Sequence, residues 1–245
     1  MRLSMWSGPR NVSTALMYAF RQRSDTEVFD EPLYGHYLAS TGADHPGARE
    51  VLDQMETDGD RVIEDVLLAE PSPERPVRFY KNMAHHLRGL DRGFLDRLTH
   101  LLLTRDPREM LTSLAHQLPH PTLADTGYPE QVELLEREEA AGRTPVVLDA
   151  RELLLDPEGV LREACRRLGL PFEPGMLRWP AGPKPEDGVW APHWYANVHA
   201  STGFAPYRPK TAPFPEPLRP LLDACRPYYD RLRAHAIRTR EVRRG

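Results

Sequence analysis

Cysteine is scarce in this sequence, which has Cys165 and Cys225 as its only two among 245 residues. Two cysteines without the spacing of metal ligands do not supply a disulfide framework or a structural zinc site. We therefore expect reduced, structural thiols and a fold that depends on its hydrophobic core. With 40% hydrophobic residues, a chain of this length can bury one such core without dividing into domains.

Long apolar runs and a strong charge of one sign are also missing. The first nine residues contain no apolar stretch of signal-peptide length, and no later run approaches the length that spans a bilayer. We expect a cytoplasmic protein with no membrane span. The net charge is −4 with both signs mixed, so no broad positive field can hold a nucleic-acid backbone and any anion must be bound locally. The basic residues 238–244 are expected to be a solvated helix end.

Short apolar segments with strand character alternate with helical patterns. The predicted strands are residues 3–6, 27–29, 77–80, 100–104 and 145–148, and the clearest predicted helices are residues 13–23, 108–117, 129–141 and 157–168. This alternation is typical of parallel sheets with crossover helices. We predict a single α/β domain over residues 1–245, with a central parallel β-sheet flanked by helices.

Proline is abundant, at 25 residues, which is about double its usual share of roughly 5%. Residues 180–217 are rich in proline, glycine and aromatic side chains and show little periodicity. Loops of this length in a compact domain are usually functional or disordered, and the aromatics argue against disorder. We predict an ordered loop that covers the ligand-binding edge of the sheet. Its Trp190, Trp194 and Tyr195 stack on an adenine ring, wall an acceptor pocket, or pack within the loop.

A candidate anion site lies where the first predicted strand gives way to the first helix. Backbone amides at such a turn, with the positive end of the helix, form an anion cradle. Glycine allows close backbone approach, arginine carries a permanent charge, and the hydroxyls lie at the helix start. An ordinary capped turn is the alternative. The candidate residues are Gly8, Pro9, Arg10, Asn11, Val12, Ser13 and Thr14.

The same turn lacks the pattern of a nucleotide triphosphatase. Such a loop reads Gly-x-x-x-x-Gly-Lys-Ser/Thr, and the lysine and the second glycine are absent here. A phosphotransferase, in which Asp30 would hold magnesium, is therefore the weaker enzyme hypothesis. A non-catalytic nucleotide-binding module is the second alternative.

A second candidate anion site follows the apolar strand at residues 100–104. Arg105 ends this strand, Asp106 and Pro107 start a helix, and Ser113 lies on that helix. The guanidinium fork and the hydroxyl can converge on one phosphate. In the alternative interpretation, Arg105 pairs with a carboxylate and Ser113 has no specific role.

Together these two segments resemble the donor-binding motifs of sulfotransferases. Residues 9–14 resemble the 5′-phosphosulfate-binding loop, commonly Pro-Lys/Arg-Ser-Gly-Thr-Thr, with Asn11 and Val12 in place of Ser-Gly. Arg105-Asp-Pro followed by Ser113 resembles the 3′-phosphate-binding motif. The motifs occur in the order that the family has, each at a strand-to-helix junction.

The whole chain also resembles a bacterial and plant sulfotransferase-like family, some members of which carry branched-chain aminotransferase names. The similar stretches are residues 6–37 and 185–204. No lysine has a setting typical of pyridoxal phosphate. The resemblance implies a P-loop-like sulfotransferase fold and transfer of a sulfuryl group from 3′-phosphoadenosine 5′-phosphosulfate (PAPS) to a hydroxyl or amine of a small acceptor. It leaves the acceptor and the oligomeric state open.

Three residues are candidates for the chemistry. Some sulfotransferases use a glutamate after the second strand, which makes Glu31 our first choice for the base that takes the acceptor proton. Cytosolic sulfotransferases carry Lys-x-His after a later strand, where this chain has Lys81 with His85 and His86 at a different spacing. We expect Lys81 near the transferred group and His85 as the alternative base. An imidazole with an ordinary pKa of about 6.5 can take a proton near neutral pH.

Structural roles are the alternatives for these residues: a cap for Glu31, and a surface or capping position for Lys81 and His85. We expect no metal, because the transferred group carries one negative charge that cationic side chains and amides can stabilise.

Overall fold

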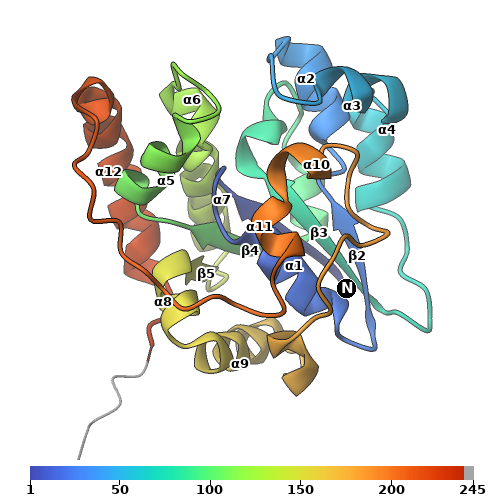
Figure 1. Cartoon of the computed structure of the whole chain (residues 1–245). Coiled ribbons are helices and arrows are strands. Elements are labelled where there is room, and N and C mark those ends of the chain that lie inside the picture. The colour runs from blue at the N-terminus through green and yellow to red at the C-terminus, as the bar shows by residue number, and fades with distance from the viewer. Residues whose placement is uncertain (240–245) are drawn as a thin grey trace, which may run out of the picture.

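The computed structural model describes residues 1–239 of the chain, so most of the basic segment 238–244 lies outside the described residues. A five-stranded parallel sheet forms the centre, in the order β2-β3-β1-β4-β5 (Figure 1). The strands are β1 (Arg2–Ser7), β2 (Thr26–Asp30), β3 (Val77–Met83), β4 (Thr99–Thr104) and β5 (Val146–Asp149). The predicted single α/β domain with a central parallel sheet is confirmed.

Twelve α-helices connect and cover these strands within residues 1–239. They are α1 (Ser13–Arg21), α2 (Tyr34–Thr41), α3 (Ala48–Gln54), α4 (Gly59–Val62), α5 (Pro107–Leu114), α6 (Leu123–Thr126), α7 (Tyr128–Ala140), α8 (Ala150–Leu155), α9 (Pro157–Leu168), α10 (Ala191–Trp194), α11 (Ala196–His199) and α12 (Arg219–His235). Short π or 3-10 turns occupy Ile63–Leu67, Ala84–Leu87, Gly93–Arg97, Pro174–Leu177 and Glu216–Leu218. None of the described helices is both long and apolar enough to cross a membrane.

Local signals explain where the predicted helices begin and end. Helix α9 matches its predicted bounds because Asp156 caps its start, accepting from the amide of Gly159 at 2.9 Å, and Gly169 ends it at a φ of 71°. Helix α5 stops at Leu114, three residues early. Beyond Leu114 the amides of Gln117 and Leu118 both donate to the carbonyl of Leu114 at 2.9 Å, which forms a closing turn just before Pro119.

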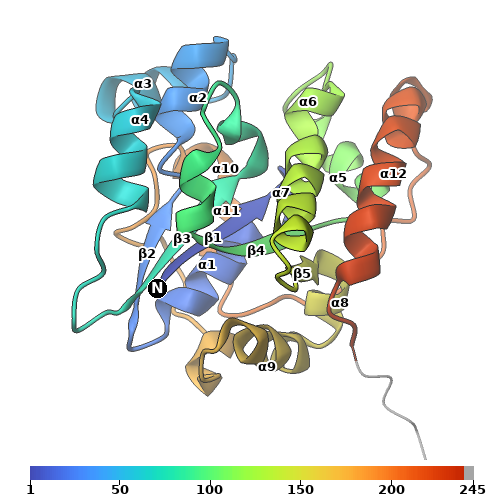
Figure 2. The same cartoon turned by 180° about the vertical axis from the view of Figure 1, so that it is seen from behind.

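The sheet separates two hydrophobic clusters, because successive strand residues face opposite sides. Leu3 and Met5 of β1 pack in one cluster with α1 and α9, whereas Trp6 packs in the other with α7 and α12. Helices α7 and α12 lie on the face seen in Figure 2. Cys165 and Cys225 are buried and unpaired, one in each cluster, in line with the predicted structural thiols.

Strand β1 is the point from which the chain builds in two directions. From β1 the chain passes to β2 on one side, returns to β3 beside β1, and then reaches β4 on the other side. Ligands of open parallel sheets bind beyond the carboxyl ends of the strands at such a switch point. The two motifs of the sequence follow β1 and β4, so the topology brings them to this edge together.

Gln131 of α7, a helix on the side of the sheet seen in Figure 2, bonds to this edge. Its side chain is completely buried, and Nε2 donates to the carbonyls of Trp6 in β1 and Leu103 in β4, each at 2.9 Å. One amide thus joins the ends of the two strands that carry the motifs.

We predict that Gln131→Leu lowers the free energy of unfolding by about 1–3 kcal/mol, because the carbonyls of Trp6 and Leu103 each lose a buried hydrogen bond and Leu103 keeps the one from Asn11. Urea unfolding measures this change. Glu136→Leu, at an exposed position of the same helix, is the control and should change stability by less than about 0.5 kcal/mol. Equal effects of the two variants would contradict the role assigned to Gln131.

Candidate functional site

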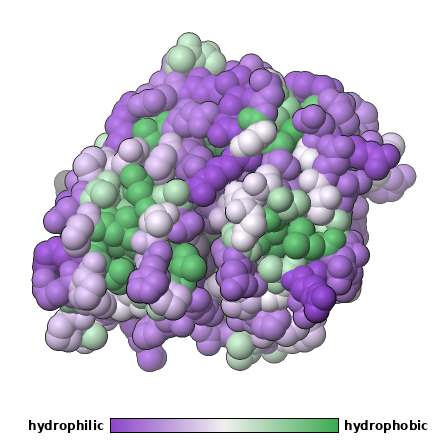
Figure 3. Space-filling model, turned by 90° about the horizontal axis from the view of Figure 1, so that it is seen from above, coloured by the Kyte–Doolittle hydropathy of each residue, from purple (hydrophilic) through white to green (hydrophobic). Residues whose placement is uncertain are grey.

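A cavity of about 460 Å³ opens at the carboxyl edge of the sheet. The loops after β1, β2, β3 and β4 contribute to it, and so does the segment 180–217, called the covering segment below. Viewed from above in Figure 3, this side of the molecule has two green hydrophobic areas separated by purple hydrophilic atoms. The lining residues from the predicted set are Pro9, Arg10, Asn11, Val12, Ser13, Thr14, Glu31, Lys81, His85, Arg105 and Ser113.

Backbone strain marks two of these positions. Arg10 and Glu31, with φ values of 54° and 47°, are the only non-glycine residues among residues 1–239 with a positive φ. Such conformations cost of order 1–3 kcal/mol each and persist where the surrounding structure determines them. Both strained residues line the cavity, one after β1 and one after β2.

The two motifs are in direct contact although they lie about a hundred positions apart in the chain. Nε of Arg10 donates to Oγ of Ser113 at 3.0 Å, and a guanidinium nitrogen of Arg105 donates to the carbonyl of Arg10. Arg105 also pairs with the carboxylate of Glu109 at 3.1 Å, as our alternative interpretation expected. The structure therefore has Arg105 both at the cavity and on a carboxylate.

Positive charge is concentrated at this end of the cavity. Burial, and then the charge of Arg105, lower the pKa of Arg10. Burial likewise lowers the pKa of Lys210, and both Arg105 and Arg10 lower it further. Because these three cations repel one another, an anion bound between them would be stabilised.

The turn before α1 is tied down by its own side chains. Nδ2 of Asn11 donates to the carbonyl of Leu103 at 3.1 Å, and its Oδ1 accepts from the amide of Val12 at 2.8 Å. Ser13 and Thr14 follow at the helix start, where the first amides have no partner within a helix. Gly8 does not line the cavity. A Cβ at Gly8 would lie 2.5 Å from the carbonyl oxygen of Thr126. The lack of a side chain at Gly8 therefore makes room for the backbone of Thr126 and not for a ligand.

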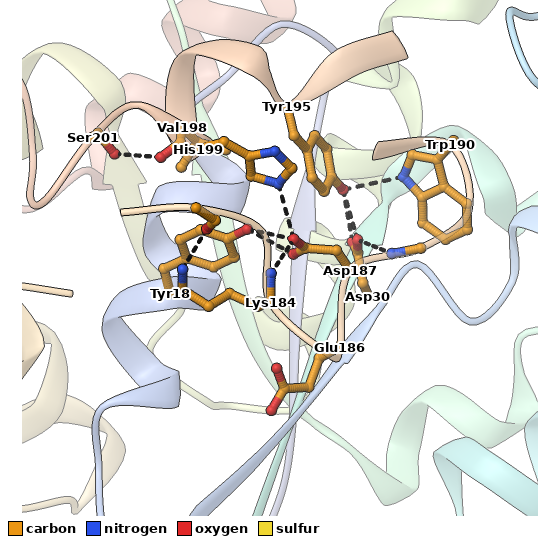
Figure 4. Close-up of polar contacts among 12 residues, drawn as sticks. Tyr18, Asp30, Lys184, Glu186, Asp187, Trp190, Tyr195, Val198, His199 and Ser201 are labelled. Carbon is orange, nitrogen blue, oxygen red and sulfur yellow. Dashed lines mark hydrogen bonds and ion pairs between the residues drawn. The ribbon is translucent and has the colours of Figure 1, made fainter. Parts of the chain in front are cut away.

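Lys81 lies in the wall of the cavity, within a cluster of buried acids. Its ammonium donates to Oδ1 of Asp30 at 2.8 Å, to the hydroxyl of Tyr195 at 2.6 Å, and to Oε1 of Glu31. The hydroxyl of Tyr195 donates to Asp30 at 2.7 Å and accepts from Nε1 of Trp190 at 3.1 Å (Figure 4). The covering segment is thus bonded to the ends of β2 and β3.

Burial and charge set the protonation of this cluster. Burial alone would lower the pKa of Lys81, but Asp30 and Glu31 outweigh it and raise that pKa well above its ordinary value. Burial raises the pKa of Glu31. The charge of Lys81 lowers this pKa, whereas the charge of Asp30 raises it further. The ammonium therefore stays protonated, while Glu31 is a stronger base than an exposed glutamate.

His85 departs from our expectation of an ordinary imidazole. Burial, followed by the neighbouring His45 and Arg88, lowers the pKa of His85 to about 3. Burial, followed by the neighbouring His85, also lowers the pKa of His86. An imidazole this weakly basic is poorly matched to taking a proton near neutral pH.

Several lining residues were not singled out as site residues by the sequence. Tyr34 and Tyr37 of α2 and His45 after it line the cavity, and Lys210 joins its basic end. The i,i+3 spacing of the two tyrosines, which puts both on one helix face, is the signal that could have found them. Trp190 and Tyr195 are buried and also line the cavity, so two of the roles that the sequence left open, packing and walling a pocket, apply to them.

The family of the chain follows from comparison with known proteins. The family model described as "Sulfotransferase domain" matches residues 1–236. The chain belongs to this sulfotransferase family. A crystal structure of a sulfotransferase from Alicyclobacillus acidocaldarius aligns with 97% of the chain and 96% of its own length, with a TM-score of 0.54 and 17% identity, which supports the fold.

Two curated relatives carry another kind of name. The Arabidopsis thaliana proteins called branched-chain-amino-acid aminotransferase-like protein 1 and 2 are 43% and 41% identical to the chain over 231 and 232 residues. Each alignment covers 94% of the chain and 41% of the relative, so the chain spans about two fifths of their length.

We predict that Tyr195→Phe loosens the covering segment, because Lys81 and Trp190 lose an acceptor and Asp30 a donor. The free energy of unfolding should fall by about 1–3 kcal/mol, and limited proteolysis within residues 180–217 should become faster. Tyr228→Phe, on α12 and outside the cavity lining, is the matched control. Unchanged proteolysis in the Tyr195 variant would argue against this anchor.

Proposed function

We propose that the chain transfers a sulfuryl group from PAPS to a hydroxyl or amine of a small acceptor. The observation that carries this proposal is one cavity with a crowded cationic end, at Arg10, Arg105 and Lys210, and a buried carboxylate, Glu31, in its wall. Membership of the sulfotransferase family supports it.

The cationic end fits the two anionic groups of the donor. Residues 10–14 and the start of α1 would bind the 5′-phosphosulfate through backbone amides, hydroxyls and the Arg10 guanidinium. Arg105 and Ser113 would bind the 3′-phosphate, with Lys210 beside them. Because Arg10 already contacts Ser113, the two sites adjoin and Arg10 can serve both.

The reaction joins the acceptor oxygen or nitrogen to sulfur and breaks the bond from sulfur to the 5′-phosphate oxygen of 3′-phosphoadenosine 5′-phosphate, while the acceptor loses a proton. Glu31 would take that proton. Arg10 and the amides of residues 11–14 would stabilise the charge on the leaving phosphate. We propose that Lys81 orients Glu31 and adds positive charge near the transferred group. His85 is the weaker candidate base, given its low pKa.

The alternatives are less well supported. Asp30, which a phosphotransferase would use for magnesium, accepts from Lys81, Tyr195 and the amide of Gly188. Within residues 1–239 no group of three or more acids, histidines or cysteines is arranged to hold a metal. A non-catalytic module would bind the donor without turnover. The absence of a metal, the lack of a nucleic-acid partner and the cytoplasmic location stay predictions.

We predict that 3′-phosphoadenosine 5′-phosphate stabilises the fold far more than adenosine monophosphate does, because only the former has both phosphates. At a concentration of a hundred times its dissociation constant, it should raise the free energy of unfolding by about 2.7 kcal/mol. A thermal shift, measured with and without a metal chelator and with adenosine monophosphate at the same concentration, tests this. Ser113→Ala should weaken the binding of 3′-phosphoadenosine 5′-phosphate and leave that of adenosine monophosphate nearly unchanged. Equal stabilisation by the two nucleotides would remove the 3′-phosphate site, and binding lost on chelation would favour the phosphotransferase.

We predict that Glu31→Gln lowers turnover by roughly 10²- to 10⁴-fold, the usual range for loss of a general base, and leaves donor affinity nearly constant. In the unmodified protein, activity should fall as the pH drops through the pKa of Glu31. That pKa lies above the ordinary glutamate value of about 4.3 because burial disfavours the charged form. The acidic limb of the pH profile should disappear in the variant.

PAPS hydrolysis, with water as the acceptor, is the turnover to measure until the acceptor is known. His85→Gln is the comparison variant. If Glu31→Gln kept its turnover and His85→Gln lost it, the base would be His85. If Glu31→Gln failed to bind the donor, Glu31 would be structural.

A further inference from the structure

The end of the cavity away from the cations is enclosed by aromatic rings. Tyr34 and Tyr37 stack on His86 with ring centroids 4.9 and 4.7 Å apart, and Trp190 meets Tyr34 edge-on at 5.1 Å. The full set, called the aromatic box below, is Tyr34, Tyr37, His45, His85, His86 and Trp190, and every member lines the cavity. Trp194 lies between the two ends, with the ring of His45 at 6.5 Å from its own ring and the Arg10 guanidinium over the same ring at 5.8 Å.

The charges of this end are negative. Asp44, Asp125 and Glu31 line the cavity, and Oε2 of Glu31 lies 4.0 Å from Nε2 of His86 in the box. Burial lowers the pKa of His45, and both Asp125 and Asp44 oppose that shift, which places the two carboxylates close to the box. The lining cations Arg10, Arg105 and Lys210 gather at the opposite end. Lys81 is offset by Asp30 and Glu31.

Two imidazoles of the box carry no charge. His85 and His86 are 4% and 1% exposed, and Nδ1 of each is enclosed by protein atoms with no hydrogen bond within residues 1–239. Burial keeps both rings neutral. A neutral imidazole carries no charge that would repel a cation.

We infer that the acceptor is a small hydroxylated amine, bound with its ammonium group in the aromatic box and its hydroxyl against Glu31. Ring faces and carboxylates both attract an ammonium, and the neutral rings of His85 and His86 do not repel it. An anionic acceptor would instead face Asp44, Asp125 and Glu31. The inference rests on the proposed function: the hydroxyl oxygen bonds to sulfur, its proton passes to Glu31, and 3′-phosphoadenosine 5′-phosphate leaves.

The test compares three phenols that differ in the charge of one side chain: tyramine, neutral 4-ethylphenol and anionic 3-(4-hydroxyphenyl)propionate. Each is titrated by calorimetry into the whole protein saturated with 3′-phosphoadenosine 5′-phosphate, and each is then assayed for sulfation with PAPS. Tyramine should bind about tenfold more tightly than 4-ethylphenol, and the anionic phenol should bind most weakly. Sulfation rates should follow the same order.

Variants connect this preference to the box. In the double variant Asp44→Asn with Asp125→Asn, the advantage of tyramine should shrink to less than about threefold while the affinity for 4-ethylphenol stays constant. Asparagine keeps an oxygen for the cap that Asp125 provides to Thr122, and a thermal melt checks folding. Asp53→Asn, exposed and outside the cavity lining, is the control and should keep the full preference.

The outcomes separate the two proposals. If 3′-phosphoadenosine 5′-phosphate binds and tyramine has no advantage over 4-ethylphenol, or keeps its advantage in the folded double variant, the hydroxylated-amine inference is overturned and the proposed sulfotransfer stands. If 3′-phosphoadenosine 5′-phosphate itself fails to bind, the proposed function fails and the inference fails with it.

Discussion

The ammonium of Lys81 between Asp30 and Glu31 is the interaction on which the rest of the site depends. Removing one partner of a buried ion pair typically costs about 3–5 kcal/mol, because the other charge stays buried without compensation. Here the pair joins the ends of β2 and β3, and Tyr195 extends it to the covering segment. The same ammonium thus ties the covering segment to the sheet and bonds the side chain of the strained residue Glu31.

The strand order explains why motifs remote in sequence meet. In a parallel sheet all carboxyl ends share one edge, and the chain leaves β1 toward opposite sides. The loop after β1 therefore lies beside the loop after β4, and Arg10 reaches Ser113. An anion site built this way needs no single long motif, because each loop supplies one or two groups and the paired strands set the relative position of the loops.

Most strands and the best-capped helices could be predicted from the sequence, since apolar alternation and caps are local. Helices α10 and α11 could not, because each has four residues and is held by packing of Trp190 and Tyr195 rather than by periodicity. At the site, Arg10, Glu31 and Ser113 were recognisable as residue types in motifs. The neutral state of His85 was not, because the shift of its pKa comes from burial by segments remote in the sequence.

The two oxygens of Glu31 have different surroundings. Oε1 accepts from Lys81, whereas Oε2 lies 4.0 Å from Nε2 of His86, on the side of the aromatic box. Lys81 lowers the basicity of the carboxylate as a whole, and burial raises it. If both oxygens were bound to cations, Glu31 would be a poor proton acceptor. Because one oxygen is fixed by Lys81 and the other faces a neutral ring, the carboxylate is both oriented and available to a hydroxyl between the two ends of the cavity.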